Sequence, residues 1–329
     1  MSETLKRRIA APGPKKILAC DGGGILGLIS VEILARLEAD LRAARNDPNL
    51  VLADFFDFAC GTSTGAIIAA LLALGHDVEG IHQLYKRHVP EIMRRRSPAA
   101  KSRELARLAQ DVFGSKGFAD VKTGIGIVAT KWLIERPMIF KGSASLAHGR
   151  AGTFVPGFGV SIAEAVQASC SAYPFFDRKC VQTASGDRVE LIDGGYCANN
   201  PTLYAIADAV QALRKPPEQL RVVSIGVGAY PAPKPTWLMR LAKRYLVSVR
   251  LLQKTLDINT QSMEQLRTVL FGDLPTVRIS DTFEQPEMAT DFMEHDLNKL
   301  NLLRQRGSES FSSRELELRK LLLSTATEA

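Results

Sequence analysis

Apolar and polar residues alternate along the start of the chain in a pattern that predicts two strand–turn–helix units. The run KKILAC, residues 15–20, suits a short apolar strand, and apolar residues then recur at helical spacing from Ile25 to about Leu41. In the next unit LADFFDFAC is strand-like, GTSTG is a turn, and AIIAALLALG is a helix ended by Gly75. Two such units in succession predict a mostly parallel sheet covered by helices.

The same patterns continue through the rest of the chain. The runs GIGIVAT and PMIF predict buried strands, SIAEAVQAS begins with a capping box at Ser161 and Glu164, and RVELIDGG predicts a strand followed by a glycine turn. Asn200 suits the N-cap of a further helix and Pro201 its first position. LRVVSIGVG predicts another central strand. After about Tyr230 the pattern is helical and amphipathic, with one late strand near TVRIS.

These elements predict one α/β domain, a three-layer sandwich with a mostly parallel central sheet. We expect a polar N-terminal tail over residues 1–14 and a single domain over 15–329. Within that domain we expect a core over about 15–228 and a helical C-terminal region over about 229–329. Residues 86–107 lose periodicity and gain charge, which indicates a surface insertion or a lid rather than a domain boundary.

Composition narrows the cellular setting. The five cysteines include no paired C-x-x-C spacing, which favours free thiols in a reducing compartment over a disulfide framework or a zinc site. The N-terminus lacks the apolar core of a signal peptide, and no later run reaches the roughly 18 apolar residues of a spanning helix. We therefore expect a cytoplasmic protein that is at most peripheral to a membrane. The net charge of +7 makes an anionic membrane or a nucleotide a plausible partner.

The first turn, DGGGILG, has two possible interpretations. Gly22, Gly24 and Gly27 match the G-x-G-x-x-G pattern with which a backbone approaches a pyrophosphate. A dinucleotide fold also requires an acidic residue at the end of its second strand, however, and GTSTG stands there instead.

The sequence GTSTG predicts a catalytic serine. It matches G-x-S-x-G, and it falls between a strand and a helix, where a tight turn projects Ser63 from the end of a sheet. The alternative is a turn that only caps its helix through Ser63 or Thr64. With a nucleophile at this place, the loop of Gly22, Gly23 and Gly24 is best interpreted as an oxyanion hole of backbone N–H donors.

A serine nucleophile needs a base, and Asp193 is the preferred candidate. It ends the apolar strand VELI and precedes Gly194, so we expect it, like Ser63 and the glycine loop, at the carboxyl end of a parallel strand. The chain order Ser63, Asp193, His295 also allows a triad, but His295 falls among charged positions of an expected helix. The other histidines, His76, His82, His88 and His148, lie in or near polar, loop-like segments. A Ser–Asp dyad is therefore preferred, and its chemistry requires no metal or cofactor.

The motifs DGGGILG, GTSTG and DGG, in this order, resemble those of the patatin-like phospholipases. ASCSAYPFF, residues 168–176, resembles the family's segment rich in alanine and serine. The resemblance implies an α/β sandwich, a Ser63–Asp193 dyad without histidine, an oxyanion hole at Gly22–Gly24, and hydrolysis of acyl esters in membrane phospholipids. One departure is Leu26, where many family members carry a basic residue.

Alternatives remain for both activity and control. The same acyl-enzyme would serve an acyltransferase or a general esterase, and a non-catalytic lipid-binding protein is disfavoured because both dyad residues are present. The segment 236–258 is a basic amphipathic helix that suits an anionic lipid surface, a lid, or packing on the core. The chain also resembles bacterial patatin-like effectors that cyclic nucleotides switch on in anti-phage defence. That resemblance implies a cyclic nucleotide activator and a homo-oligomer on activation, with no nucleic acid polymer as partner.

Overall fold

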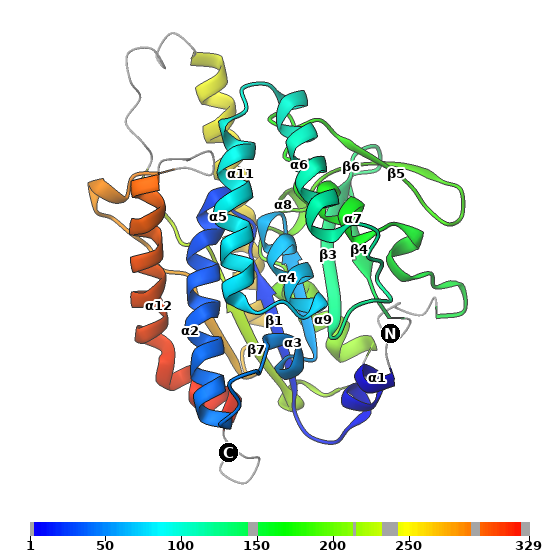
Figure 1. The fold of residues 1–329 in the computed structure, drawn as a ribbon, viewed down its shortest axis with the longest axis vertical. Helices are drawn as coiled ribbons and strands as arrows, with labels where there is room; N and C mark the ends of the chain where they lie inside the picture. Colours follow the sequence, from blue (N-terminus) through cyan, green and yellow to red (C-terminus); the bar gives the residue numbers. More distant parts are fainter. Residues whose placement is uncertain (1–2, 144–150, 213–214, 232–242, 291–296, 324–329) are drawn as a thin grey trace.

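A mixed β-sheet, with most of its strands parallel, runs through the centre of the molecule (Figure 1). The computed structural model describes residues 3–143, 151–212, 215–231, 243–290 and 297–323. Within these ranges the sheet is 8-stranded, in the order β5-β6-β3-β2-β1-β7-β8, with β4 also paired to β3. The strands are β1 Lys15–Cys20, β2 Phe58–Thr62, β3 Gly124–Lys131, β4 Arg136–Lys141, β5 Lys179–Gln182, β6 Arg188–Asp193, β7 Leu220–Ile225 and β8 Thr276–Ile279. Parallel pairing joins β3, β2, β1, β7 and β8, which confirms the predicted sheet.

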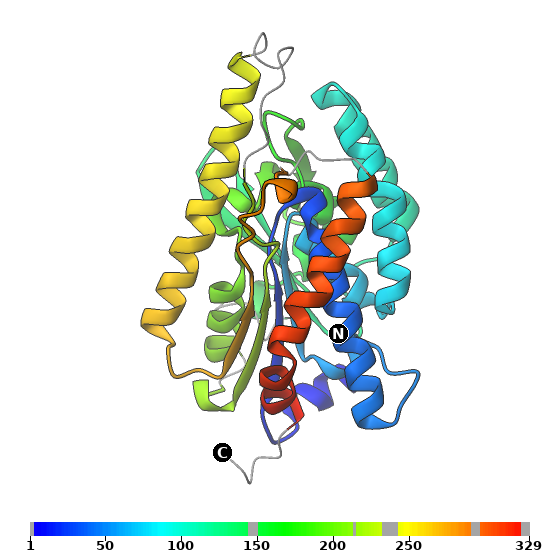
Figure 2. The ribbon, with the colours of Figure 1, turned by 90° about the vertical axis from the view of Figure 1, so that its left-hand side faces the viewer.

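Helices cover both faces of the sheet, and the alternation of side chains along β1 explains why. Leu18 and Cys20 belong to one buried apolar cluster, whereas Ile17 belongs to a second cluster on the other face. The first face carries α2 Gly27–Arg45, α3 Leu52–Phe55, α4 Thr64–Leu74, α5 Val78–Arg94, α6 Pro98–Phe113, α7 Ile162–Ser169 and α12 Leu297–Leu323. The second carries α8 Gly195–Ala198, α9 Thr202–Ala212 and α11 Lys243–Leu270. Figure 2 shows the strands between α11 on one side and α2 with α12 on the other.

Local signals place several helix ends where the sequence predicts them. The helix α4 is buried on every side, as its uninterrupted apolar sequence requires, and it ends at Gly75 in a left-handed conformation with φ 89°. The capping box of Ser161 and Glu164 begins α7. The helix α9 begins at Thr202, one residue later than predicted, and Asn200 Oδ1 accepts a hydrogen bond of 3.0 Å from the N–H of Thr202.

Two segments differ from the prediction. The first 14 residues are not only a polar tail, because Glu3–Ala10 form the helix α1, whose Leu5 is buried. Residues 86–107 are mostly not irregular either, since all but residues 95–97 belong to the amphipathic helices α5 and α6. The charges that hide their periodicity lie on the outer face, where Arg95 pairs with Glu104 and other arginines pair likewise within these helices.

The C-terminal region contributes to the same sheet. β8 confirms the predicted late strand and pairs in parallel with β7, and the long helices α11 and α12 confirm the helical pattern. Trp237 and Arg240 of the basic segment lie outside the described residues.

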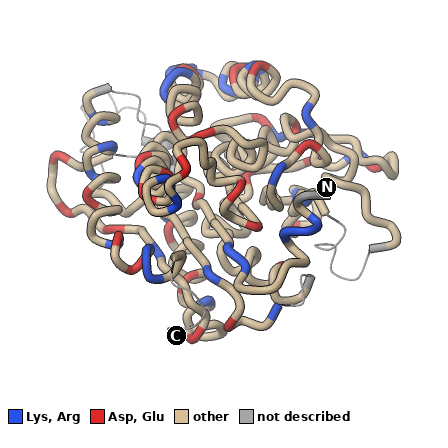
Figure 3. Tube along the Cα trace, turned by 60° about the horizontal axis from the view of Figure 1, so that its bottom comes forward, with Lys and Arg blue, Asp and Glu red and all other residues tan. Residues whose placement is uncertain are grey.

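Basic and acidic positions are interspersed along the trace in Figure 3 rather than separated into two faces. Many of them pair with a neighbour, for example Arg304 with Glu32 between α12 and α2 at 3.3 Å. The positive net charge therefore does not by itself mark a binding face in this view.

Candidate active site

Ser63 occupies a strained turn between β2 and α4. Its φ of 53° and ψ of −123° are unusual for a residue with a side chain, and they project Oγ away from the sheet. The flanking glycines allow this turn through close packing. A Cβ atom on Gly65 would lie 2.2 Å from the carbonyl oxygen of Cys20, and one on Gly61 would lie 2.1 Å from the carbonyl oxygen of Gly65. The helix α4 starts at Thr64, so its positive dipole end is beside Ser63.

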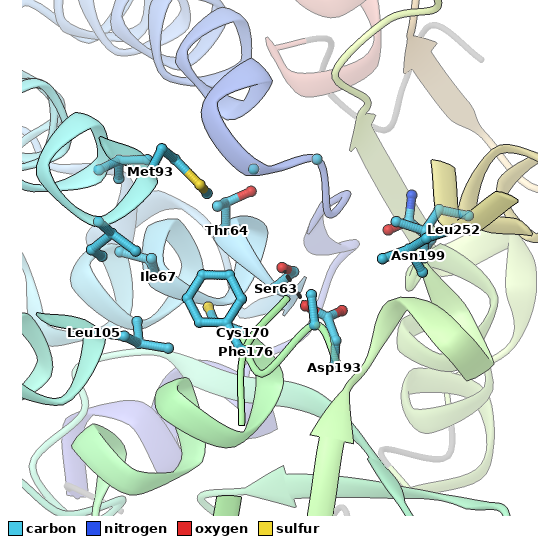
Figure 4. A pocket seen from close by; sticks show the side chains of 16 residues that line it. Ser63, Thr64, Ile67, Met93, Leu105, Cys170, Phe176, Asp193, Asn199 and Leu252 are labelled. Atoms are coloured by element: carbon cyan, nitrogen blue, oxygen red, sulfur yellow. Dashed lines mark hydrogen bonds between the residues drawn. The ribbon is translucent and has the colours of Figure 1, made fainter. Parts of the chain in front are cut away.

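Asp193 reaches Ser63 from the opposite direction. Ser63 Oγ donates a hydrogen bond of 2.7 Å to Asp193 Oδ2, as Figure 4 shows. The expectation that Asp193 ends a parallel strand is wrong, because β6 is antiparallel to β3. β4 pairs with one edge of β3. Along the other edge, β2 pairs with β3 as far as Val128, and the pairing of β6 with β3 starts at Ala129. The carboxyl ends of β2 and β6 therefore meet head to head.

Burial makes Asp193 a stronger base than an ordinary aspartate. Only 3% of the residue is exposed, and this desolvation raises the pKa of its carboxyl to about 6. Hydrogen bonds from the Gly195 N–H to Oδ1, at 2.7 Å, and from Ser63 to Oδ2 act in the opposite direction and limit the rise in the pKa.

The alanine- and serine-rich segment, which starts in the last turn of α7, holds the backbone of both residues. Ser169 Oγ accepts a hydrogen bond of 2.8 Å from the N–H of Ser63 and donates one to the carbonyl of Val128. The carbonyl of Ser171 accepts a hydrogen bond of 2.9 Å from the N–H of Asp193. The sequence singled out this segment by resemblance alone, and the structure shows its physical contribution.

The glycine loop presents two unpaired donors toward the same site. The N–H of Gly22 donates to the carbonyl of Asn199 at 3.0 Å, so it is engaged elsewhere. Within the described part of the chain, the N–H groups of Gly23 and Gly24 have no hydrogen-bond partner, and both residues line the cleft beside Ser63. Of the three predicted donors, Gly23 and Gly24 are therefore the ones left available.

Three contacts that the sequence did not predict support the glycine loop. Tyr85 of α5 donates to the carbonyl of Gly24, and Asn199 Nδ2 donates to the carbonyl of Gly22 at 3.2 Å. Next to the loop, Asp21 forms a buried ion pair with Arg278 of β8.

The Asp21–Arg278 ion pair is relevant to position 26, where the sequence has leucine in place of the basic residue of the pattern that it resembles. Leu26 is a buried core residue rather than a basic one. The positive charge beside the loop comes instead from Arg278, 252 positions further along the chain, and no local pattern could have identified it.

An apolar cleft opens beside the dyad (Figure 4). Its wall combines α4, α5 and α6 with α11 and the segment after α7. The lining includes Ile67, Val89, Ile92, Met93, Leu105, Cys170, Ala172, Phe176, Leu252 and Leu256. The cavity volume is about 50 Å³, well below the roughly 300–1,000 Å³ of pockets that enclose small-molecule ligands. The cleft is therefore narrow compared with sites that enclose a ligand.

Other nucleophiles and bases do not compete with the dyad in the described chain. His82 and His88 are not in loops but lie buried in α5, and neither lines the cleft. His295 and His148 lie outside the described residues. Cys170 does line the cleft, but burial raises the pKa of its thiol well above the usual value, so it stays protonated. All five cysteines are free thiols, and three are buried, in agreement with the expectation.

No helix in the described ranges has both the length and the apolar character needed to cross a membrane.

The chain is similar to known patatin-like proteins. Residues 18–206 match the family described as patatin-like phospholipase. A cUMP-AMP-activated phospholipase of Escherichia coli is 62% identical over 308 residues, which cover 94% of each protein. A cGAMP-activated phospholipase of Vibrio cholerae serotype O1 is 27% identical over 210 residues, 58% of this chain and 56% of that protein. Among solved structures, VipD from Legionella pneumophila shares the fold with a TM-score of 0.52 at 12% identity, covering 94% of this chain and 68% of that chain.

Proposed function

This chain belongs to the patatin-like phospholipase family, and we propose that it hydrolyses acyl ester bonds of membrane phospholipids through a Ser63–Asp193 dyad. The observation that carries the proposal is the 2.7 Å hydrogen bond from Ser63 Oγ to a buried carboxylate, beside two unpaired backbone N–H groups in an apolar cleft.

In the proposed reaction Asp193 takes the proton of Ser63 as Oγ attacks the ester carbonyl carbon. The N–H groups of Gly23 and Gly24 donate to the oxyanion of the tetrahedral intermediate. When that intermediate collapses, the lysolipid alcohol leaves with the proton from Asp193, and an acyl group stays on Ser63. Asp193 then deprotonates a water that attacks the acyl-enzyme. Fatty acid is released and the Ser63 hydroxyl is restored.

The test is product analysis with a defined phospholipid. With cyclic UMP–AMP present, wild-type protein is expected to release fatty acid and lysolipid, and Ser63→Ala and Asp193→Asn are each expected to abolish release. The double variant is expected to be no worse than either single one, because the pair acts as a unit. Transfer of the acyl group to an added alcohol in preference to water would identify an acyltransferase. Full turnover by Asp193→Asn would reject the dyad.

We also propose that a cyclic dinucleotide switches the activity on. The E. coli relative that matches 94% of the chain is named for activation by cUMP-AMP, and the narrow cleft described above is consistent with a closed resting form. An activator shifts a closed–open equilibrium only through its preference for the open form, and a change from about 1% to 99% open requires roughly 5.5 kcal/mol. Assembly into a homo-oligomer on activation would supply part of that preference.

We propose accordingly that the protein is cytoplasmic and acts at the inner face of the membrane in anti-phage defence. Fatty-acid release should be measured with and without cyclic UMP–AMP, with cyclic di-AMP as the comparison. High activity that no nucleotide changes would identify a lipase without nucleotide control and would reject the proposed activation.

A further inference from the structure

The turn between β3 and β4 carries three consecutive exposed apolar residues. Trp132, Leu133 and Ile134 are 37%, 79% and 55% exposed. Tyr173, 38% exposed, packs against Trp132 with ring centroids 5.3 Å apart and ring planes tilted by 60°. These four residues are called the apolar lip below. Contiguous exposed apolar side chains on a globular protein mark an interaction site.

The apolar lip lies close to the catalytic pair. Ala129 of β3 is the register partner of Asp193, and the Trp132 N–H donates to the carbonyl of Glu190 in β6 at 2.9 Å. Trp132 is three residues after Ala129, and three residues of extended chain span about 10 Å. Trp132 therefore lies about 10 Å from Asp193 along the strand direction. Tyr173 is continuous with the cleft wall, because its neighbour Ala172 lines the cleft.

The aromatic part of the lip is held in place and is flanked by positive charge. The guanidinium of Arg178 lies 5.1 Å from the ring centroid of Trp132 and 5.5 Å from that of Tyr173. Tyr196, three residues after Asp193, donates to the carbonyl of Tyr173. Lys131 and Arg136 stand on either side of the turn, Glu135 lies within it, and Arg178 also pairs with Glu190 at 3.0 Å. Three basic side chains and two acidic ones therefore leave a net charge of +1 beside the lip.

We propose that the apolar lip inserts into the interface of an anionic phospholipid bilayer and so brings Ser63 to the ester bonds of the lipid. The inference rests on the proposed function, because only a lipid substrate requires this approach. Tryptophan and tyrosine favour the headgroup level, leucine and isoleucine favour the hydrocarbon, and nearby basic side chains attract anionic headgroups. A three-residue tip is also too small for a stable protein interface, which buries roughly 1,200–2,000 Å² in total.

The first test uses tryptophan fluorescence. The chain has 2 tryptophans, so Trp237→Phe leaves Trp132 as the only emitter, and Ser63→Ala in the same protein prevents hydrolysis. Vesicles of phosphatidylglycerol and phosphatidylethanolamine are added with and without cyclic UMP–AMP. We expect a blue shift of Trp132 emission and quenching by brominated acyl chains. Unchanged emission under both conditions, whether or not the protein sediments with the vesicles, would overturn the proposal.

The second test compares two leucines of equal exposure. Leu133 is 79% exposed and Leu316 of α12 is 80% exposed, and α12 does not line the cleft. In the Ser63→Ala protein, Leu133→Glu is expected to lower vesicle partitioning by about tenfold or more, since a charge replaces an inserted apolar group. Leu316→Glu is expected to bind as the parent does. Both variants should keep the parent melting temperature, because exposed substitutions change stability little.

The outcomes separate the two proposals. If vesicle binding depends on Leu133 but wild-type protein releases no fatty acid even with cyclic UMP–AMP, the phospholipase proposal fails and the lip proposal stands. If wild-type protein releases fatty acid while Leu133→Glu binds vesicles as well as Leu316→Glu does, the lip proposal is wrong. A Leu133→Glu variant that loses self-association in the absence of vesicles, with unchanged vesicle binding, would assign the lip to a second copy of the chain and would also overturn the proposal.

Discussion

At the scale of single residues, Asp193 is almost completely withdrawn from water by the protein itself. An aspartate with an ordinary pKa near about 3.9 is a weak base at neutral pH, and desolvation is one way to strengthen it. The structure places the carboxyl at 3% exposure before any lipid enters, and burial raises its pKa to about 6. A base with this pKa is largely ionised at neutral pH and still accepts a proton readily.

The raised pKa predicts the pH dependence of activity. In the free enzyme Asp193 must be ionised to accept the Ser63 proton, so kcat/KM should fall as the pH drops through about 6. The measurement is the initial rate on a soluble, non-ionisable ester across the acid range. A profile that stays flat down to about pH 4, the ordinary range of an aspartate, would show that the site does not raise this pKa.

The same shift predicts an effect on stability. Because the folded-state pKa is above the ordinary 3.8, ionised Asp193 destabilises the fold. This penalty is absent below the ordinary pKa, grows between 3.8 and about 6, and is complete above about 6. Asp193→Asn should therefore raise the free energy of unfolding at neutral pH by up to about 3 kcal/mol, from roughly two pKa units at 1.36 kcal/mol each. Urea unfolding of wild type and Asp193→Asn at neutral pH and at about pH 3.5 measures this difference. An equal gain in the free energy of unfolding at both pH values would contradict the prediction.

Gly23 of the loop has no room for a side chain. Its backbone is extended, with φ 171°, but a Cβ atom would lie 2.6 Å from Cγ2 of Val227. Gly23→Ala should therefore displace the N–H donors and lower kcat by about 10²–10³-fold, with a smaller change in KM. Steady-state kinetics on a soluble ester provide the check. A raised KM with unchanged kcat would make the loop a ground-state binding element instead.

At the scale of elements, α11 connects the cleft to the turn after Asp193. Asn259 of α11 accepts a hydrogen bond of 2.7 Å from the N–H of Asn199 and donates one of 3.1 Å to the carbonyl of Cys197. About one turn and two turns earlier in α11, Leu256 and Leu252 line the cleft. A displacement of α11 would therefore widen the cleft and disturb the support of the glycine loop together.

Adjacent leucines of α11 provide a matched test of this gating role. Leu252 is 5% exposed and lines the cleft, whereas Leu251 is 65% exposed. Leu252→Ala removes packing worth about 2–5 kcal/mol from the closed arrangement, so nucleotide-free fatty-acid release should rise at least tenfold. Leu251→Ala should leave the nucleotide-free rate as it is in wild type. Equal rates in the two variants would show that α11 does not close the cleft.

At the scale of the whole molecule, activation by a nucleotide predicts ligand-dependent stability and size. A ligand that binds only folded protein stabilises it by about 2.7 kcal/mol at 100 times its dissociation constant. Cyclic UMP–AMP should thus raise the melting temperature by several degrees, and cyclic di-AMP should raise it less. Sedimentation velocity on the same samples should show a larger species with cyclic UMP–AMP alone. An unchanged melting temperature and sedimentation coefficient would argue against nucleotide control.

Much of this organisation was determined by the sequence itself, because the signals are local. Apolar periodicity predicts the strands and the helices, and strand ends followed by glycines single out Ser63, Asp193 and the glycine loop as candidates. Capping residues such as Ser161 and Asn200 mark helix starts because their side chains bond to backbone only two or three residues away. These features need no knowledge of distant parts of the chain.

Tertiary structure decided the features that depend on residues far apart in sequence. Strand direction is one, since an apolar run has the same pattern whether it pairs in parallel or not, and only the pairing with β3 brings Asp193 head to head with Ser63. Arg278, Tyr85 and Asn199 reach the glycine loop from three separate elements, so no local spacing reveals them. Desolvation of Asp193 is likewise a sum over everything that packs around it, which is why its basicity could be deduced only from the folded chain.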